Sequence, residues 1–296
     1  MPGSTTITIS IVLFAFAQTS DPSLGQDAPS APTVYEMPYS LFNPTPRGER
    51  RALDPERPDA TQNPTTVDAG VIQIETGFFQ YTKDSHRVTP DSVETWAIFS
   101  ETNFRLGLLA DLELQIIFTP YISEEITPDG GTKMTNDGIS DFTLRLRHNY
   151  WGNDPEPDQN TALGSEAFLV IPTGSQVSSG KIEAGAAGNF QWEFAPDFSL
   201  AFTAEPAFRY NTGSARYDFV LLTTAELIVE VFSGITTYAE LAGTATTAGS
   251  SAYEGSFNLG ALFGLNDDVA FDVGLNFGLT RAADDFSGTI GITVRF

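Results

Sequence analysis

The sequence predicts an all-β fold: a transmembrane antiparallel up-and-down β-barrel of about twelve strands with a proline-rich N-terminal extension. Three observations predict it. A short apolar segment near the N-terminus ends in an A-x-A triplet, apolar and polar residues alternate with a period of two from residue 70 onward, and aromatic residues gather at the ends of the alternating segments. Together these features are typical of a bacterial outer-membrane barrel.

Composition excludes several other classes of protein. The 296-residue chain has no cysteine, which excludes disulfides, thiol nucleophiles and zinc fingers. Its 15 Lys and Arg against 38 Asp and Glu give a formal net charge of −23. Nucleic acid is not an expected partner, because phosphate binding requires a basic surface. Only His86 and His148 supply imidazoles, so no metal site and no cofactor is expected.

Residues 1–17 have the pattern of a secretory signal peptide. The apolar run from Ile7 ends in Ala15-Phe16-Ala17, which predicts cleavage after Ala17, and the run is too short to span a bilayer. No Lys or Arg precedes Ile7, so two alternatives stay open: cleavage after Gly25, or a buried first strand. With the barrel pattern that follows, the predicted location is the outer membrane of a Gram-negative-type bacterium.

Residues 18–68 differ from the rest of the chain by their proline content. They hold nine of the chain's 18 prolines. Proline lacks an amide donor and fixes φ, so this segment cannot form a long helix or strand ladder. It is predicted to be a periplasmic extension or a plug inside the barrel, and residues 69–296 are predicted to be the barrel itself.

The period of two is clearest from Phe198 to Tyr210, where Phe198, Leu200 and Phe202 alternate with polar or small residues such as Thr203 and Glu205. A helix would scatter these apolar residues around its surface. Twelve such segments follow one another: 71–81, 92–106, 112–121, 138–150, 162–172, 181–194, 198–210, 217–231, 235–243, 252–264, 269–280 and 286–296.

The connections between the segments support a barrel. Four of the five predicted periplasmic turns are tight, and residues 151–161 form the exception. The longest predicted outer loop is 122–137. Aromatic residues at segment ends, such as Trp192 and Tyr210, suit the bilayer interfaces. The C-terminal Phe296 is the kind of residue that the barrel assembly machinery reads in outer-membrane proteins, so that machinery and the lipid bilayer are expected partners.

Parity places charged residues of the predicted strands on the lumen side, as candidates for lining a pore. They are Asp141, Arg145, Arg147, Glu183, Glu193, Glu205, Arg209, Glu226, Glu230 and Asp272. Two interpretations remain open. Arginines opposite carboxylates could form a selectivity constriction, or they could be interstrand ion pairs that fill the interior.

Three parts of the sequence resemble one family. The run Glu56-Arg57-Pro58-Asp59-Ala60-Thr61-Gln62-Asn63-Pro64-Thr65-Thr66-Val67, with Gly70 and Gln73-Ile74-Glu75, resembles the entry to the first strand in the outer-membrane transporter family linked to the meta-pathway of phenol degradation. Ile171-Pro172-Thr173-Gly174-Ser175 and the C-terminal Val294-Arg295-Phe296 are similar to later parts of that family. The resemblance covers 56–296 in patches. It implies a FadL-like channel for passive uptake of small hydrophobic or aromatic compounds, and it supplies no binding residues.

A barrel enzyme and a purely structural barrel are the alternatives. Lipase-like barrels place a serine activated by histidine on the lipid face. His148 has the parity to face lipid, but Tyr150 stands where such an enzyme would have its serine. The prediction is therefore that the protein is not an enzyme.

Overall fold

The computed structural model describes residues 39–85, 92–128, 130–154, 159–247 and 253–296. The predicted signal peptide, 1–17, and residues 18–38 of the predicted extension lie outside the described residues. The described residues belong to one compact unit, Met37–Phe296. Its only helical turn among them is η1 (Arg47–Glu49). No helix in this part of the chain is long and apolar enough to cross a membrane.

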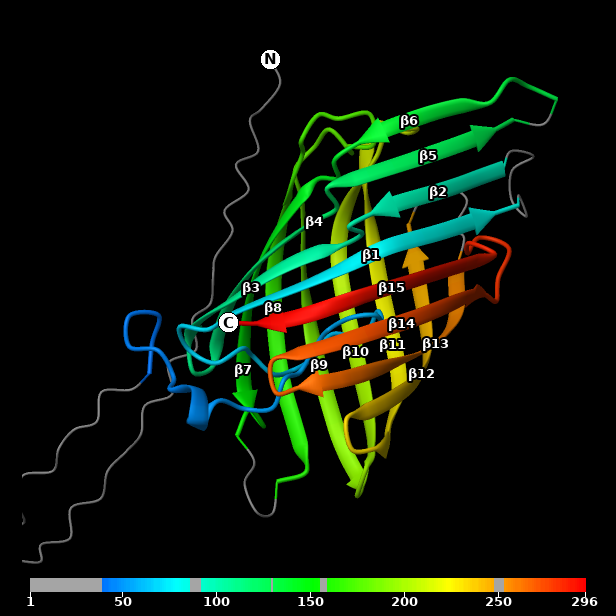
Figure 1. The fold of residues 1–296 in the computed structure, drawn as a ribbon. Helices are drawn as coiled ribbons and strands as arrows, with labels where there is room; N and C mark the ends of the chain where they lie inside the picture. Colours follow the sequence, from blue (N-terminus) through cyan, green and yellow to red (C-terminus); the bar gives the residue numbers. More distant parts are fainter. Residues whose placement is uncertain (1–38, 86–91, 129, 155–158, 248–252) are drawn as a thin grey trace, which may run out of the picture. The chain divides into compact units, whose positions relative to one another are not determined.

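The described residues contain fifteen strand segments: β1 (Ile72–Asp84), β2 (Ser92–Ile98), β3 (Thr102–Leu109), β4 (Leu112–Phe118), β5 (Tyr121–Thr127), β6 (Met134–Gly138), β7 (Phe142–Trp151), β8 (Thr161–Ile171), β9 (Glu183–Ala195), β10 (Phe198–Asn211), β11 (Arg216–Phe232), β12 (Ile235–Thr246), β13 (Tyr253–Asn266), β14 (Val269–Gly278) and β15 (Phe286–Arg295). They make twelve barrel strands, because β2–β3, β4–β5 and β6–β7 are each one strand interrupted once. All neighbours pair antiparallel, and β15 pairs with β1 to close the barrel (Figure 1). The predicted fold class and strand number are confirmed.

The three interruptions lie side by side on the barrel wall. Ser140 donates its amide to the carbonyl of Thr119, and Glu101 donates its amide to the Thr119 hydroxyl. Pro120 follows directly and has no amide to give to a ladder, which explains a break there. The predicted strands 92–106, 112–121 and 138–150 are therefore each broken rather than continuous.

Beyond the interruptions, β5 and β6 form a hairpin where the sequence predicts the outer loop 122–137. That prediction is wrong, because only residues 128–133 connect the two strands. The hairpin carries polar pairs, for example Lys133 with Glu125 at 2.6 Å. A strand that extends past the lipid needs no apolar face, so the alternation that marks the other strands is absent here.

The barrel wall is apolar outside and polar inside. On β10, Phe202 and Phe208 are exposed, whereas Thr203 and Glu205 are buried. The largest fully buried side chains of the described residues are mostly polar or charged, and include Arg105, Arg147, Gln73, Gln115, Glu75, Glu113 and Glu240. A lipid bilayer requires this inverted arrangement, because only apolar side chains can face hydrocarbon.

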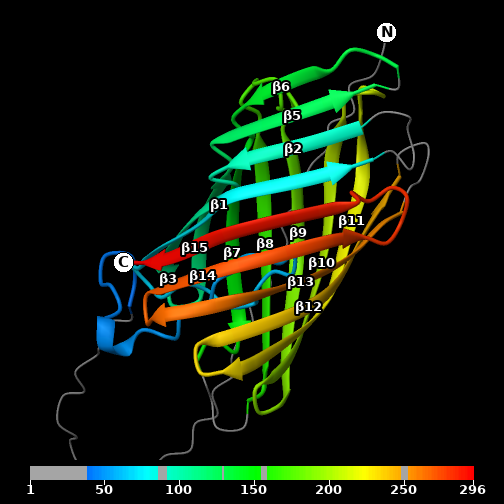
Figure 2. The same cartoon turned by 45° about the vertical axis from the view of Figure 1, so that its right-hand side comes forward.

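A non-strand stretch of chain fills the lumen. We call residues 54–68 the inner segment. Its backbone amides donate to side chains on opposite walls, for example Val67 to Glu113 on β4 at 2.7 Å and Thr61 to Glu240 on β12 at 2.6 Å. Figures 1 and 2 both place the chain that leads into it, in blue, at the barrel end where the C-terminus lies. That end carries the short turns, which are periplasmic in outer-membrane barrels.

Candidate functional site in the barrel lumen

Two arginines of β7 hold the inner segment against one wall. The Arg147 side chain is completely buried, and it forms ion pairs with Glu166 of β8 at 2.6 Å and with Glu56 of the inner segment. Arg145 pairs with the same Glu166 at 3.2 Å and donates to the side-chain oxygen of Gln62 at 2.6 Å. These contacts connect two barrel strands and the inner segment in one network.

A second network joins β1, β3 and β4 to the same segment. Buried Arg105 donates to Glu113 at 2.6 Å and to Glu75 at 2.9 Å. The other oxygen of Glu75 accepts the backbone amides of Glu56 and Arg57, at 2.9 and 3.1 Å. Each buried charge therefore has an opposite charge or a hydrogen-bond donor beside it, as burial of charge requires.

The opposite wall contacts the inner segment mainly through carboxylates. Glu240 of β12 accepts the amide and the hydroxyl of Thr61, both at 2.6 Å. Asp272 of β14 pairs with Arg57 at 3.2 Å. Since contacts run to both walls, the inner segment crosses the lumen instead of lying along one side.

Two glycines of the wall allow the backbone of this chain to approach closely. A Cβ at Gly164 of β8 would collide with the carbonyl of Pro64, and one at Gly107 of β3 would collide with the carbonyl of Asp68. The wall is therefore shaped to receive the inner segment at these points.

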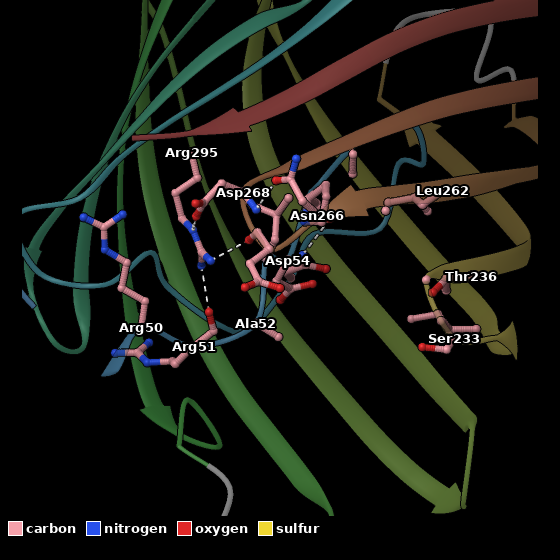
Figure 3. A pocket seen from close by; sticks show the side chains of 18 of the residues that line it. Arg50, Arg51, Ala52, Asp54, Ser233, Thr236, Leu262, Asn266, Asp268 and Arg295 are labelled. Atoms are coloured by element: carbon pink, nitrogen blue, oxygen red, sulfur yellow. Dashed lines mark hydrogen bonds and ion pairs between the residues drawn. The ribbon is translucent and has the colours of Figure 1, made fainter. Parts of the chain in front are cut away.

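Toward the periplasmic mouth, residues 50–55 separate two cavities. The larger, of about 730 Å³, lies between these residues and strands β11–β14 (Figure 3). The smaller, of about 460 Å³, lies on the side of β8 and β9. At the rim of the larger cavity Asp268 accepts hydrogen bonds from Arg295 at 3.0 Å and from Arg47 at 2.5 Å. The bond from Arg295, with the charge of Arg47, holds the pKa of Asp268 below its ordinary value.

The predicted lumen residues fall into three groups. Glu183, Glu205, Glu226, Asp272 and Arg147 are buried inside the barrel, and Arg145 and Arg209 are partly buried there. Arg209 pairs with Glu183 and Glu205, at 3.3 and 3.2 Å. Whether these side chains line a path for cargo stays a prediction.

The remaining three predicted residues lie at the ends of the barrel. Asp141 lies at the outer rim, where it accepts the amides of Thr173 and Ser179, both at 2.9 Å, and so secures the loop after β8. Glu193 and Glu230 are exposed toward the periplasmic end, and Glu193 lines the smaller cavity.

Sequence reasoning missed several residues that form the contacts between the inner segment and the wall. They are Glu56 and Arg57 of the segment and Glu75, Arg105, Glu113, Glu166 and Glu240 of the strands. For the five strand residues a signal was available, because each has the lumen-side parity of its strand. Glu56 and Arg57 carry no such signal, since they lie in a segment without periodicity.

His148 and Ser165 are the described residues that bear on a barrel enzyme. His148 lies on the outer face, with Asp111 at 3.6 Å and the ring of Tyr150 at 4.8 Å between centroids. Ser165 is opposite His148 across the β7–β8 pair, but its hydroxyl is hydrogen-bonded to that of Tyr150 at 2.8 Å. His86 lies outside the described residues. The described part of the chain contains no group of three or more His, Asp or Glu side chains that could hold a metal ion.

The model of the family described as putative MetA-pathway of phenol degradation matches residues 56–296, which include the inner segment from Glu56 and the whole barrel. The chain belongs to this family. The resemblance expected from the sequence is confirmed.

Several solved structures are similar to this member of the family. A crystal structure of an outer membrane channel from Pseudomonas putida F1 superposes with a TM-score of 0.57 at 12% identity, covering 82% of this chain and 100% of that one. The KdgM porin has a TM-score of 0.46 at 10% identity, covering 76% and 99%. The CymD monoaromatic hydrocarbon channel has a TM-score of 0.41 at 8% identity, covering 76% and 88%. No curated protein matches the chain. The fold is that of outer-membrane β-barrels.

Proposed function

We propose that this protein is an outer-membrane channel for passive uptake of small hydrophobic or aromatic compounds, and that the inner segment is its plug. The observation that carries the proposal is a closed barrel, apolar outside and polar inside, whose lumen is crossed by a non-strand segment. A purely structural wall would not need a separate segment in its lumen. The family description, phenol degradation, supports an aromatic cargo.

Single-channel recording in planar bilayers tests the plug. The protein without its predicted signal peptide is compared with a form that also lacks residues 39–68. We expect little conductance from the first and steady conductance from the second. Equal conductance in both forms would contradict the plug.

Uptake by intact cells tests the cargo. Outer-membrane-limited uptake of phenol should rise when the protein is produced in a Gram-negative host that lacks it. A matched hydrophilic solute, such as a disaccharide, should enter at an unchanged rate while the plug is present. Unchanged phenol uptake would contradict the proposed cargo.

A structural barrel without transport is the alternative that the buried ion-pair networks favour. The fully buried Arg105 and Arg147 networks occupy space that a pore would leave open. Silence of both forms in the planar bilayer would support this alternative over a channel.

A further inference from the structure

The larger periplasmic cavity has an acidic wall that the proposed function does not use. Asp59 of the inner segment and Glu226 of β11 both line it, and their carboxyl groups are hydrogen-bonded to each other. Two carboxyl groups in such contact must share a proton or hold a cation between them. Glu226 is only 3% exposed, so bulk water screens its carboxyl group little.

Among the ion pairs of the described residues, none includes Asp59 or Glu226. Four arginines line the same cavity: Arg47 and Arg295 pair with Asp268, Arg51 pairs with Asp68, and Arg50 forms no ion pair with Asp59 or Glu226. The pair thus has an unmet requirement for a cation.

The hydroxyl of Tyr238 points independently to a ligand. This side chain of β12 lines the same cavity and is 4% exposed, yet its hydroxyl has no hydrogen-bond partner among the described residues. A buried hydroxyl without a partner is unfavourable, and a bound polar group would satisfy it. The hydroxyl lies close enough to Asp59 and Glu226 to interact with them electrostatically.

Of the other carboxyl groups near this cavity, that of Asp267 at the rim is exposed, and four have partners of their own. Glu240 accepts from Thr61, Asp272 from Arg57, Asp54 from Thr65, and Glu75 from Arg105. Asp59 and Glu226 are therefore the pair left to recognise a ligand.

Apolar side chains complete the cavity. Ile228 of β11, Leu262 of β13 and Ala270 of β14 line it together with Tyr238. Figure 3 shows Leu262 on the side of the cavity away from Arg295 and Asp268. Its volume of about 730 Å³ lies in the range typical of small-molecule sites, which combine apolar walls with a few polar groups.

We propose that this cavity binds a small organic ammonium compound. Its N–H groups donate to Asp59 and Glu226 and to the oxygen of Tyr238, and its hydrocarbon body contacts Ile228 and Leu262. The proton that the two carboxyl groups share in the empty site leaves to solvent when the ammonium group binds, and no covalent bond to carbon forms or breaks. The inference rests on the proposed function only in placing this site on the path of cargo.

Calorimetric titration of the detergent-solubilised protein with benzylamine tests the site. Benzyl alcohol and benzoate are the matched neutral and anionic probes. We expect benzylamine to bind more tightly than either. Titrations at pH 7 in phosphate and in Tris, whose ionisation enthalpies differ, should show that benzylamine binding releases a proton to the buffer.

Single substitutions test whether the carboxyl pair binds benzylamine. Glu226→Gln should weaken benzylamine binding roughly tenfold, because a hydrogen bond to a charged group is stronger than one to a neutral group, and should abolish proton release. Asp59→Asn should also weaken benzylamine binding and abolish proton release, and it changes the inner segment without altering the barrel wall. Tyr238→Phe should weaken binding less and leave proton release intact. Glu230→Gln is the control, because Glu230 has the same parity on β11 but is exposed and does not line the cavity.

Three results would overturn the inference: no binding of benzylamine, equally tight binding of benzoate or benzyl alcohol, or unchanged affinity in both Glu226→Gln and Asp59→Asn. Binding in detergent does not depend on transport. Loss of benzylamine binding with normal phenol uptake would overturn the ammonium site alone. Specific benzylamine binding with silent bilayers would overturn the channel alone.

Discussion

At the scale of single residues, buried charge is the main feature of this lumen. Arg147 is completely buried, and its guanidinium lies between Glu166 on the barrel wall and Glu56 on the inner segment. The two carboxylates compensate one cation and depend on it in turn. Removing one member of such a set costs more than the pair contributes, because it leaves the other charges buried without compensation.

We therefore predict that Arg147→Met lowers the free energy of unfolding by about 3 to 5 kcal/mol. Denaturant unfolding of the lipid-reconstituted protein measures the change. Arg216→Met is the control, because Arg216 pairs with Asp218 at 3.3 Å with its side chain 56% exposed. An exposed pair of this kind contributes little. Equal losses in the two variants would contradict a special role for the buried network.

Asp268 makes stability depend on pH. Its pKa in the folded protein is lowered by Arg295 and Arg47, so its contribution is present above the unfolded pKa and is lost as pH falls through the folded pKa. The stability difference between wild type and Asp268→Asn should be constant above about pH 5 and shrink below about pH 4. Unfolding titrations over this range measure it.

Asp267→Asn is the matched control for that prediction. Asp267 contacts Arg295 through its backbone carbonyl, at 2.7 Å, which the substitution keeps. A difference between wild type and Asp268→Asn that persists undiminished at the acid end would contradict the assignment.

At the scale of elements, the inner segment and the wall fit each other by both charge and shape. The segment has no secondary structure of its own, so its backbone amides find acceptors in Glu75, Glu113 and Glu240 of the wall. Gly164 adds shape, because its missing side chain leaves room for the backbone at Pro64. The position of the segment is thus determined by the strands around it.

We predict that Gly164→Val displaces the inner segment, because a Cβ there collides with the Pro64 backbone. The cysteine-free chain permits a clean probe: Thr61→Cys, at a fully buried position, should react with a maleimide faster in the Gly164→Val background. Gly188→Val is the control, because a Cβ at Gly188 meets nothing within 4 Å. Equal reaction rates in the two backgrounds would show that the segment tolerates the larger residue.

At the scale of the whole molecule, closure of the barrel joins the two ends of the strand order. β15 pairs with β1, and the amide of Phe296 donates to the carbonyl of Ile72 at 2.9 Å. Closure leaves no unpaired strand edge in the lipid. The ring of Phe296 is 63% exposed and is available for recognition by another protein.

We propose that this ring is read by the barrel assembly machinery. Deletion of Phe296 should reduce the amount of folded protein in the outer membrane, whereas Phe296→Tyr should restore most of it. Quantification of folded protein in isolated outer membranes measures the effect. Refolding yield in detergent is the control and should stay unchanged. An equal loss in refolding would assign Phe296 to stability instead of recognition.

Much of the fold is predictable from the sequence because the bilayer imposes a simple rule on each strand. Phe202 and Phe208 alternate with Thr203 and Glu205, and that alternation alone identifies β10 and its lumen face. The rule fails where the lipid ends. The hairpin of β5 and β6 therefore has the sequence features of a loop, and periodicity does not mark the break at Pro120.

The candidate site is predictable only in part. Parity identifies the lumen side of Arg145, Arg147 and Glu226, but it does not identify their partners. Glu56 and Arg57 lie in a proline-rich segment whose local sequence is compatible with a free tail as well as with a plug.

The sequence by itself determined the barrel, its strand number, its lumen face and its family, because lipid on one side and polar contacts on the other act on every strand locally. Only the tertiary structure decided that residues 54–68 cross the lumen and which carboxylates hold them. Those contacts join residues as far apart in the chain as Arg57 and Asp272. Closure of the barrel brings such residues together, and no local pattern in the sequence records that encounter.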